Sequence, residues 1–144
     1  MQEEMDYSAI LKRDHHDIIK FIPDLFGAYE VIDFERFLKR TYPILECFVS
    51  VDIIVQIREQ VKNKYGNEQK CFVEHGTLQD INIETLLFYQ PDVGINGPRH
   101  TKLNEPVFVV AYQKKTLLFN GYHRTLAAIL ENKQLVRSYV LYID

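Results

Sequence analysis

The sequence is short of cysteine, of long apolar runs and of positive charge. Its two cysteines, Cys47 and Cys71, lie outside the spacings of metal-binding or redox motifs, so we expect reduced thiols and a cytoplasmic location. No apolar stretch reaches the roughly 18 residues of a membrane-spanning helix. Met1 is followed by Gln-Glu-Glu rather than by a signal sequence. We therefore expect a soluble protein with no membrane partner.

The charge balance argues against a DNA-binding protein. With a net charge of −3 and an isoelectric point near 5.9, the chain lacks the broadly basic surface that nucleic acids select. No helix–turn–helix pattern is recognisable either. We do not expect sequence-specific DNA binding, although a local basic pocket is compatible with this charge.

One cluster, Asp14-His15-His16-Asp17, has residue types that bind metals. Adjacent residues on a helix point about 100° apart, so His15 and His16 cannot readily chelate the same ion. No His-x-x-x-His or Glu-x-x-His spacing accompanies them. We interpret the cluster as a solvated helix face and expect no metal site.

The fold class follows from the spacing of the apolar residues. The chain has 144 residues, 47% hydrophobic and 12% aromatic, which is enough for one domain with a sizeable core. Near Cys71 the apolar spacing changes from helical to alternating. We therefore predict one α/β (α+β) domain over 1–144, with a helical N-terminal part (1–68) and a small mixed sheet in 69–144.

Individual elements can be predicted with differing sharpness. In the N-terminal part, helices are expected over about 1–40 and from 44 to 65, although the β-branched run 49–55 could instead be a strand, which leaves the start of the second helix open. Residues 84–89 either continue a strand or form a helical turn, and residues 91–105 form a loop. The predicted strands are 71–73, 78–83, 106–110, 115–119 and 136–142.

The stretch from 115 to 130 carries the candidate site. An apolar strand ends at Asn120-Gly121, and a helix with one apolar face follows from Thr125. A strand, a glycine turn and a helix N-terminus bring free N–H groups to one place, which suits a phosphate. The candidate phosphate-binding residues are Asn120, Gly121, His123, Arg124 and Thr125, with Arg99 and His100 from the preceding loop.

Each candidate has an expected role. Gly121 lets the backbone approach the anion, Arg124 supplies a two-pronged contact, and His123 adds a donor when protonated. Thr125 offers a hydroxyl to phosphate or to a metal-bound water. Glu105 is a weak candidate acid, base or magnesium-associated carboxylate. The competing interpretation is an ordinary turn, in which Arg124 pairs with an acidic neighbour and His123 is partly buried.

Residues 105–142 resemble the core of the ParB/sulfiredoxin-like superfamily. The features that carry the resemblance are a strand at 106–110, the turn Gly121-Tyr122-His123-Arg124, the alanines 127–128 and a closing strand at 136–141. In sulfiredoxins the turn reads Phe-Gly-Gly-Cys-His-Arg, against Phe-Asn-Gly-Tyr-His-Arg at 119–124 here. Gly97-Pro98-Arg99 is similar to an Asn-Pro-Arg step of ParB-like proteins, but the helix that usually follows it has no room.

The resemblance implies a nucleotide-binding protein. Its ligand would be a nucleoside triphosphate, ATP or CTP, with Mg²⁺ as an accompanying ion, and its activity an NTP-dependent switch or a phosphoryl transfer. Tyr122 stands where sulfiredoxins have their nucleophilic cysteine, and a phenol with a pKa near 10 cannot replace a thiolate. Sulfiredoxin activity is therefore excluded. The alternative is a non-catalytic regulatory or protein-interaction module that docks through its N-terminal helices.

Overall fold

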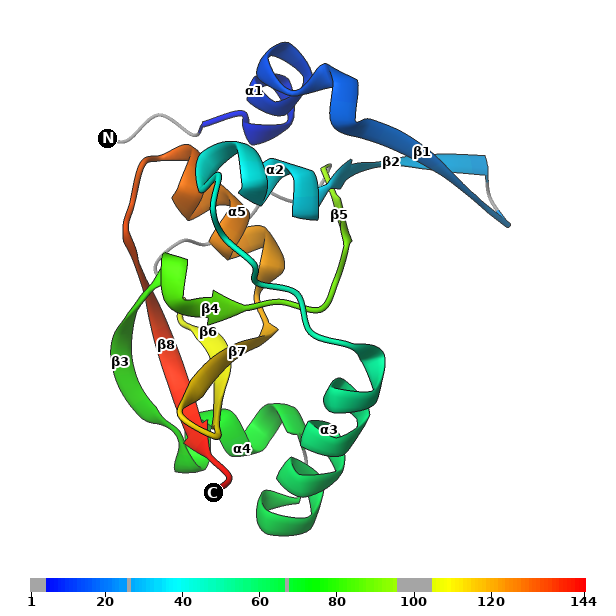
Figure 1. Ribbon diagram of the computed structural model, residues 1–144. Coiled ribbons are helices and arrows are strands. Elements are labelled where there is room, and N and C mark those ends of the chain that lie inside the picture. The colour runs from blue at the N-terminus through cyan, green and yellow to red at the C-terminus, as the bar shows by residue number, and fades with distance from the viewer. Residues whose placement is uncertain (1–4, 26, 67, 96–104) are drawn as a thin grey trace.

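The structure is a computed structural model that describes residues 5–25, 27–66, 68–95 and 105–144. Within these ranges the chain combines α-helices with two β-sheets, as the sequence predicts (Figure 1). None of the described helices is long and apolar enough to cross a membrane.

The larger sheet is mixed and comes entirely from residues after 70, which confirms that prediction. Its strands are β3 (Thr77–Asn82), β4 (Leu86–Leu87), β6 (Val107–Tyr112), β7 (Lys115–Asn120) and β8 (Leu135–Tyr142). They lie in the order β3-β8-β6-β7-β4. β6, the middle strand, pairs in parallel with β8 and antiparallel with β7. The strand that comes last in the chain, β8, therefore lies beside the middle strand of the sheet.

Helices cover both faces of this sheet. α2 (Phe34–Thr41) and α5 (Tyr122–Leu130) share one hydrophobic cluster with Val109 and Leu118. α3 (Val51–Tyr65) and α4 (Glu68–His75) share a second with Val110 and Leu117. Because neighbouring strand residues point to opposite faces, two consecutive valines of β6 belong to different cores. Figure 1 shows the resulting helix–sheet–helix layering.

A smaller sheet corrects the prediction of an all-helical N-terminal part. After α1 (Tyr7–Asp14) and the short 3-10 helix η1 (His16–Ile18), residues 19–33 form a β-hairpin, β1 (Ile19–Asp24) and β2 (Gly27–Asp33). β2 also pairs with β5 (Asp92–Gly94). Two runs of β-branched and aromatic residues are separated here by Gly27, whose φ is +126°. These hairpin signals outweigh the loosely helical spacing on which the helix prediction rested.

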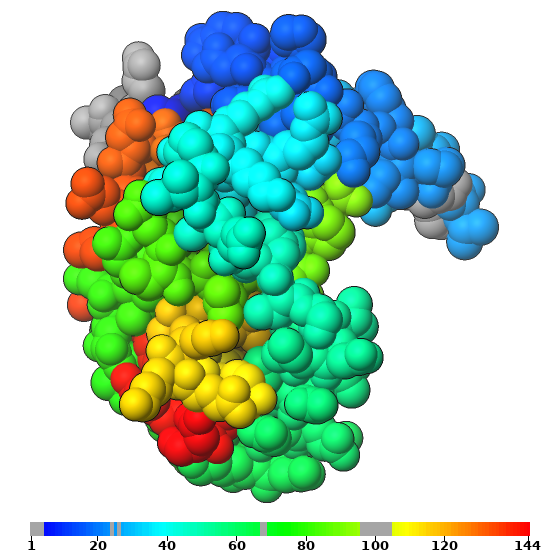
Figure 2. Space-filling view, viewed as in Figure 1, coloured from blue at the N-terminus to red at the C-terminus, as the bar shows by residue number. Residues whose placement is uncertain are grey.

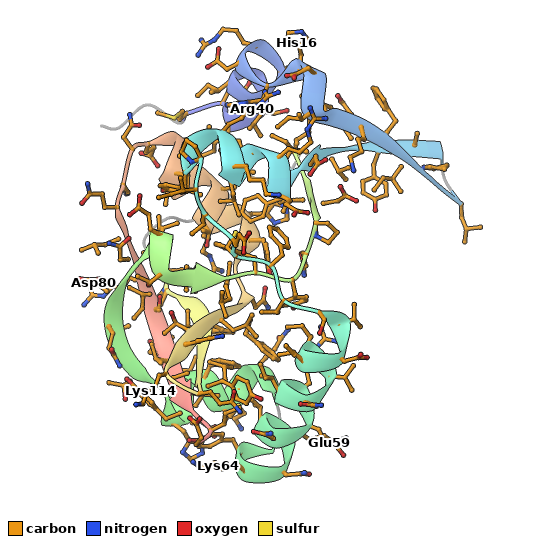
Figure 3. The ribbon with its side chains drawn as sticks, viewed as in Figure 1. His16, Arg40, Glu59, Lys64, Asp80 and Lys114 are labelled. Atoms are coloured by element: carbon orange, nitrogen blue, oxygen red, sulfur yellow. The ribbon has the colours of Figure 1, made fainter. Side chains whose placement is uncertain are left out.

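Partly exposed ion pairs connect the base of this hairpin, and η1 before it, to neighbouring elements. Arg40 of α2 donates to Asp17 of η1, with Nη1 2.8 Å from Oδ1, and Figure 3 shows Arg40 beneath α1. Lys20 of β1 lies 3.0 Å from a carboxylate oxygen of Asp92, and Lys12 of α1 lies 3.1 Å from one of Glu30.

Several other boundaries differ from the prediction. Residues 71–73 lie in α4 rather than in a strand, because Cys71 and Phe72 pack on the sheet from a helix. The long helix begins at Val51 behind a Ser50 cap, not at 44. Residues 84–89 contain the end of η2 (Ile83–Thr85) and then β4. The expected loop 91–105 contains the short strand β5, which forms by pairing with β2.

Candidate functional site: the turn between β7 and α5

The strand, glycine turn and helix predicted around Gly121 are present. β7 ends at Asn120, and α5 begins one residue further on, at Tyr122 rather than at Thr125. Gly121 joins them with φ +113° and ψ 30°, in the left-handed region that glycine tolerates best. The first helical bond runs from the Thr125 amide to the Gly121 carbonyl, at 3.0 Å. The amides before it therefore lie at the positive end of the helix dipole.

Gly121 is also required by packing. An ideal Cβ built at this position would lie 2.5 Å from Cγ1 of Val107, the first residue of β6. The absence of a side chain thus lets β6 pass close to the turn. This accounts for the glycine without reference to an anion.

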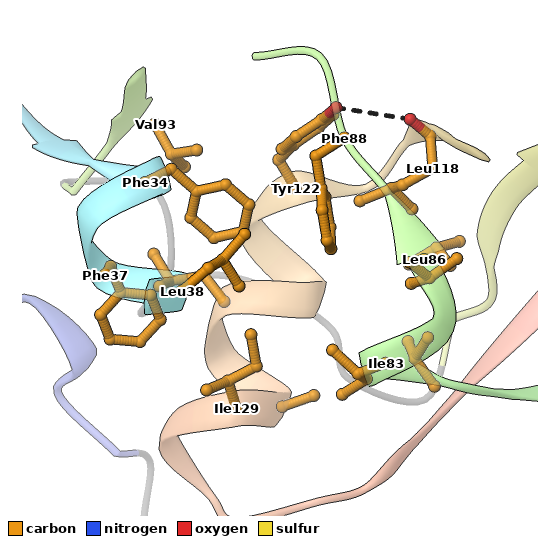
Figure 4. Packing of buried hydrophobic residues seen from close by; sticks show 14 of the residues in the cluster. Phe34, Phe37, Leu38, Ile83, Leu86, Phe88, Val93, Leu118, Tyr122 and Ile129 are labelled. Atoms are coloured by element: carbon orange, nitrogen blue, oxygen red, sulfur yellow. Dashed lines mark hydrogen bonds between the residues drawn. The ribbon is translucent and has the colours of Figure 1, made fainter. Parts of the chain in front are cut away.

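Tyr122 is a buried structural residue. Its phenol oxygen accepts hydrogen bonds from the amides of Tyr89, at 2.8 Å, and Gln90, at 3.3 Å, and donates to the carbonyl of Leu118, at 3.4 Å. Figure 4 shows its ring near Phe34 and Phe88. Burial raises the pKa of this phenol far above its ordinary value, so the group stays neutral.

Arg124 already holds two oxygen ligands. Its Nη1 donates to the carbonyl of Pro106 at 2.8 Å, and its Nη2 to Oε2 of Glu105 at 3.1 Å. The side chains of Arg124 and Glu105 are 29% and 53% exposed. The guanidinium is therefore placed to bind an anion, but a protein carboxylate already occupies the position that the anion would take.

The remaining predicted residues of the turn point different ways. Thr125 is fully buried, and its hydroxyl donates back to the Gly121 carbonyl at 3.1 Å, which stabilises the first helical turn. Asn120 is exposed at the end of β7. His123 is exposed at the surface, and partial desolvation of its imidazole lowers its pKa although a hydrogen bond with the Gly94 backbone opposes the shift. His123 is therefore chiefly neutral at pH 7, whereas the protonated, cationic imidazole would bind an anion better.

Two of the predicted phosphate ligands are not placed by the structure. Arg99 and His100 lie outside the described residues.

Both cysteines are buried without forming a disulfide, and burial raises the pKa of Cys47 to about 11, so its thiol stays protonated. No group of three histidine, cysteine or acidic side chains that could hold a metal occurs in the described ranges.

A pocket of about 260 Å³ opens at the opposite end of α5. The carbonyl end of a helix carries partial negative charge, so this pocket is a poor place for a phosphate. Its lining includes Tyr42, Glu84, Ile129, Asn132 and Lys133.

Sequence reasoning missed the backbone groups that complete the turn. The Pro106 carbonyl accepts from Arg124, and the amides of Tyr89 and Gln90 meet Tyr122. Pro106 follows the chosen Glu105 directly, so its proximity could have been inferred. Backbone amides have no residue signature, and nothing in the sequence indicates that residues 89–90 cross the start of α5.

No known protein-family model matches the chain, and no curated protein matches it either. The resemblance to the ParB/sulfiredoxin-like superfamily therefore rests on the residues of the turn and on the order of the elements around it.

Proposed function

We propose that the turn between β7 and α5 binds a phosphate group of a nucleotide, and that Glu105 occupies this place in the ligand-free protein. The supporting observation is the pair of contacts made by Arg124. At the N-terminus of α5, its guanidinium holds one carboxylate oxygen and one carbonyl oxygen. Phosphate oxygens are preferred partners of the same guanidinium fork.

We expect the replacement of Glu105 by a phosphate group at Arg124 to lower the free energy. The Arg124–Glu105 pair is partly exposed, and such pairs are worth about 0–1 kcal/mol. A charge-assisted phosphate contact contributes roughly 1.5–3 kcal/mol, and the first-turn amides add to it. Release of Glu105 from Arg124 would be the structural change of an NTP-dependent switch.

The proposal concerns binding rather than a reaction. Tyr122 and Thr125 direct their hydroxyls into the protein, and Glu105 is held by Arg124, so none of them is placed as a nucleophile or base. ATP or CTP is the proposed ligand, and Mg²⁺ would arrive with the nucleotide's own phosphate oxygens.

Calorimetric titration with ATP, CTP, GTP and ADP in the presence of Mg²⁺ tests the proposal. Arg124→Ala should weaken binding about ten- to a hundredfold, the equivalent of 1.5–3 kcal/mol. Arg124→Lys should recover only part of this loss, because an ammonium lacks the fork. Glu105→Gln should instead tighten binding, by up to about fivefold if the pair is worth 1 kcal/mol.

Arg137→Ala on the exposed side of β8 is the matched control and should leave affinity unchanged. The decisive contrast is the opposite sign of the Arg124 and Glu105 variants. If wild type binds none of the nucleotides at millimolar concentration, or if Glu105→Gln weakens binding, the proposal is wrong.

A second candidate function is a non-catalytic interaction module that retains this scaffold. The observation that favours it is the internal use of the turn: Tyr122, Arg124 and Thr125 all bond to groups of the same chain. Under this reading Arg124→Ala lowers stability alone, and no nucleotide raises the melting temperature.

A further inference from the structure

The pocket at the C-terminal end of α5 is lined by three segments that the fold brings together. They are the end of α2 with Thr41 and Tyr42, the junction of β3 and η2 with Asn82 and Glu84, and the end of α5 with the turn that follows it. Figure 2 shows these segments, coloured cyan, green and orange, adjoining at the left of the view. The pocket therefore exists only in the folded chain.

Backbone hydrogen bonds hold these walls in place. The amide of Ile83 donates to the carbonyl of Gln134 at 2.9 Å, which joins η2 to the segment after α5. The amide of Lys133 donates to the carbonyl of Ala128 at 3.0 Å, and Asn132 has a φ of +59°, so α5 ends in a tight left-handed turn. Because the backbone is already fixed, less ordering is needed when a ligand binds.

Glu84 and Lys133 bring opposite charges to the same pocket. They are the chain neighbours of Ile83 and Gln134, whose backbones are hydrogen-bonded to each other, so their side chains start from adjacent points of the wall. Within the part of the chain that the structure describes, neither charged group forms an ion pair or a hydrogen bond. Two neighbouring opposite charges are thus available to a ligand that lies between them.

Tyr42 and Ile129 supply the apolar part of the lining. Ile129 belongs to the main hydrophobic cluster, where Figure 4 shows it near Ile83, and Tyr42 packs against this cluster. Burial raises the pKa of the Tyr42 phenol, and the negative charge of Glu84 adds to the shift. Among the described residues the phenol oxygen has no hydrogen-bond partner, so it too is available to a ligand.

The size and charge of the pocket limit the class of ligand. Its volume of about 260 Å³ lies just below the roughly 300–1,000 Å³ of pockets for drug-sized molecules, so the ligand is small. Glu84 and the carbonyl end of α5 attract a positive group, whereas Lys133 attracts a negative one. A small molecule that carries both charges close together satisfies both sides of the pocket.

We propose that this pocket binds a free α-amino acid with an uncharged side chain. The ammonium group of the ligand lies at Glu84 and the carbonyl end of α5, its carboxylate at Lys133, and its side chain against Tyr42 and Ile129. Hydrogen bonds between charged groups are stronger than neutral ones, which favours this orientation. The inference does not depend on nucleotide binding at the turn, which lies at the other end of α5.

Ligands with a single charge fit the lining less well. An amine would place its positive charge near Lys133 without a compensating anion, and a carboxylic acid would place its negative charge near Glu84. Asn132 and Gln134 lie on the same wall as Lys133, and their amide groups can donate further hydrogen bonds to a carboxylate. A charged side chain on the amino acid would find no third countercharge in the described lining.

Calorimetric titration of the full chain with L-leucine tests the proposal. We expect binding in the millimolar range or tighter, and weaker binding of L-lysine and L-glutamate. Glu84→Gln and Lys133→Met should each weaken L-leucine binding about five- to tenfold, at the low end for charged hydrogen bonds because both side chains are exposed. Glu59→Gln and Lys62→Met are the matched controls on the exposed face of α3 and should leave affinity unchanged.

Two analogues assign each charged contact. L-Leucinamide keeps the ammonium but lacks the carboxylate, and N-acetyl-L-leucine keeps the carboxylate but lacks the ammonium, so each should bind about five- to tenfold more weakly than L-leucine. Lys133→Met should then weaken L-leucinamide no further, and Glu84→Gln should weaken N-acetyl-L-leucine no further.

Three results would overturn the proposal. In the first, the wild type binds no amino acid at millimolar concentration, and Glu84 and Lys133 are then solvated surface charges only. In the second, either analogue binds as tightly as L-leucine, which would indicate a site for a single charge. In the third, Glu84→Gln or Lys133→Met weakens all three ligands equally, which would indicate an effect on the shape of the pocket rather than a contact with the ligand's charge.

Discussion

Replacing Gly121 by alanine would introduce a methyl group where Val107 leaves no room for one. The added Cβ would lie 2.5 Å from Cγ1 and 2.7 Å from Cβ of that valine, and overpacking of this type costs about 1–3 kcal/mol. The φ of +113° adds strain on the order of 1–3 kcal/mol. After a gain of about 0.4–1 kcal/mol from a less flexible unfolded chain, Gly121→Ala should lower the free energy of unfolding by about 1–6 kcal/mol.

Two other glycines separate the packing contribution from the backbone contribution. Gly27 has a φ of +126° but no atom within 4 Å of an ideal Cβ, so Gly27→Ala reports strain alone, about 0–2 kcal/mol. Gly94 has neither problem, because the nearest atom, Nε2 of His123, lies 3.7 Å away. Gly94→Ala should be close to neutral.

Urea unfolding followed by far-UV circular dichroism provides the measurement, since the chain has no tryptophan. Each variant should be unfolded at two protein concentrations, because self-association would add to apparent stability. The packing argument fails if Gly121→Ala costs no more than Gly27→Ala.

Two further predictions concern the residues that follow Gly121. Tyr122→Phe leaves the amides of Tyr89 and Gln90 without their acceptor and should cost about 1–3 kcal/mol in urea unfolding. Tyr139→Phe is the control, because no hydrogen bond of its hydroxyl is seen in the described structure; equal costs would contradict the role given to the Tyr122 phenol. Because partial desolvation lowers the pKa of His123, its contribution to stability is complete above the ordinary histidine pKa of about 6.5 and is lost as the pH falls through the lowered pKa. Unfolding midpoints between pH 8 and 5 should therefore fall less steeply for His123→Gln than for wild type, and parallel curves would refute this.

The C-terminal half of the fold could be predicted because its signals are local. Alternation of apolar residues indicated β3 and β8, a short apolar run indicated β7, the resemblance included β6, and the glycine at 121 located the turn before α5. The cap of α2 is equally local, since the carboxylate of Asp33 accepts from the Arg36 amide at 3.2 Å. In each case a few neighbouring residues determine the backbone conformation.

The missed features depend on partners distant in sequence. β5 is three residues long and exists because β2 lies beside it. The apolar residues at 71–72 fit a strand or a helix, and packing against Phe108 and Phe119 selects the helix. For the candidate site, the sequence identified Arg124 but not its bond to the Pro106 carbonyl. Pairings of this kind follow from tertiary packing, which local patterns do not encode.

The position of β8 has a consequence for how the protein is synthesised. β3 and β6 both pair with β8, yet β3 is made more than fifty residues earlier. At a translation rate of about 5–20 residues per second, β3 waits several seconds as an open edge before its partner leaves the ribosome. During that interval the exposed Leu78 side and the free backbone groups of β3 are available to other nascent chains. Chaperone binding to ribosome-bound chains should therefore end only once residues 135–142 have emerged.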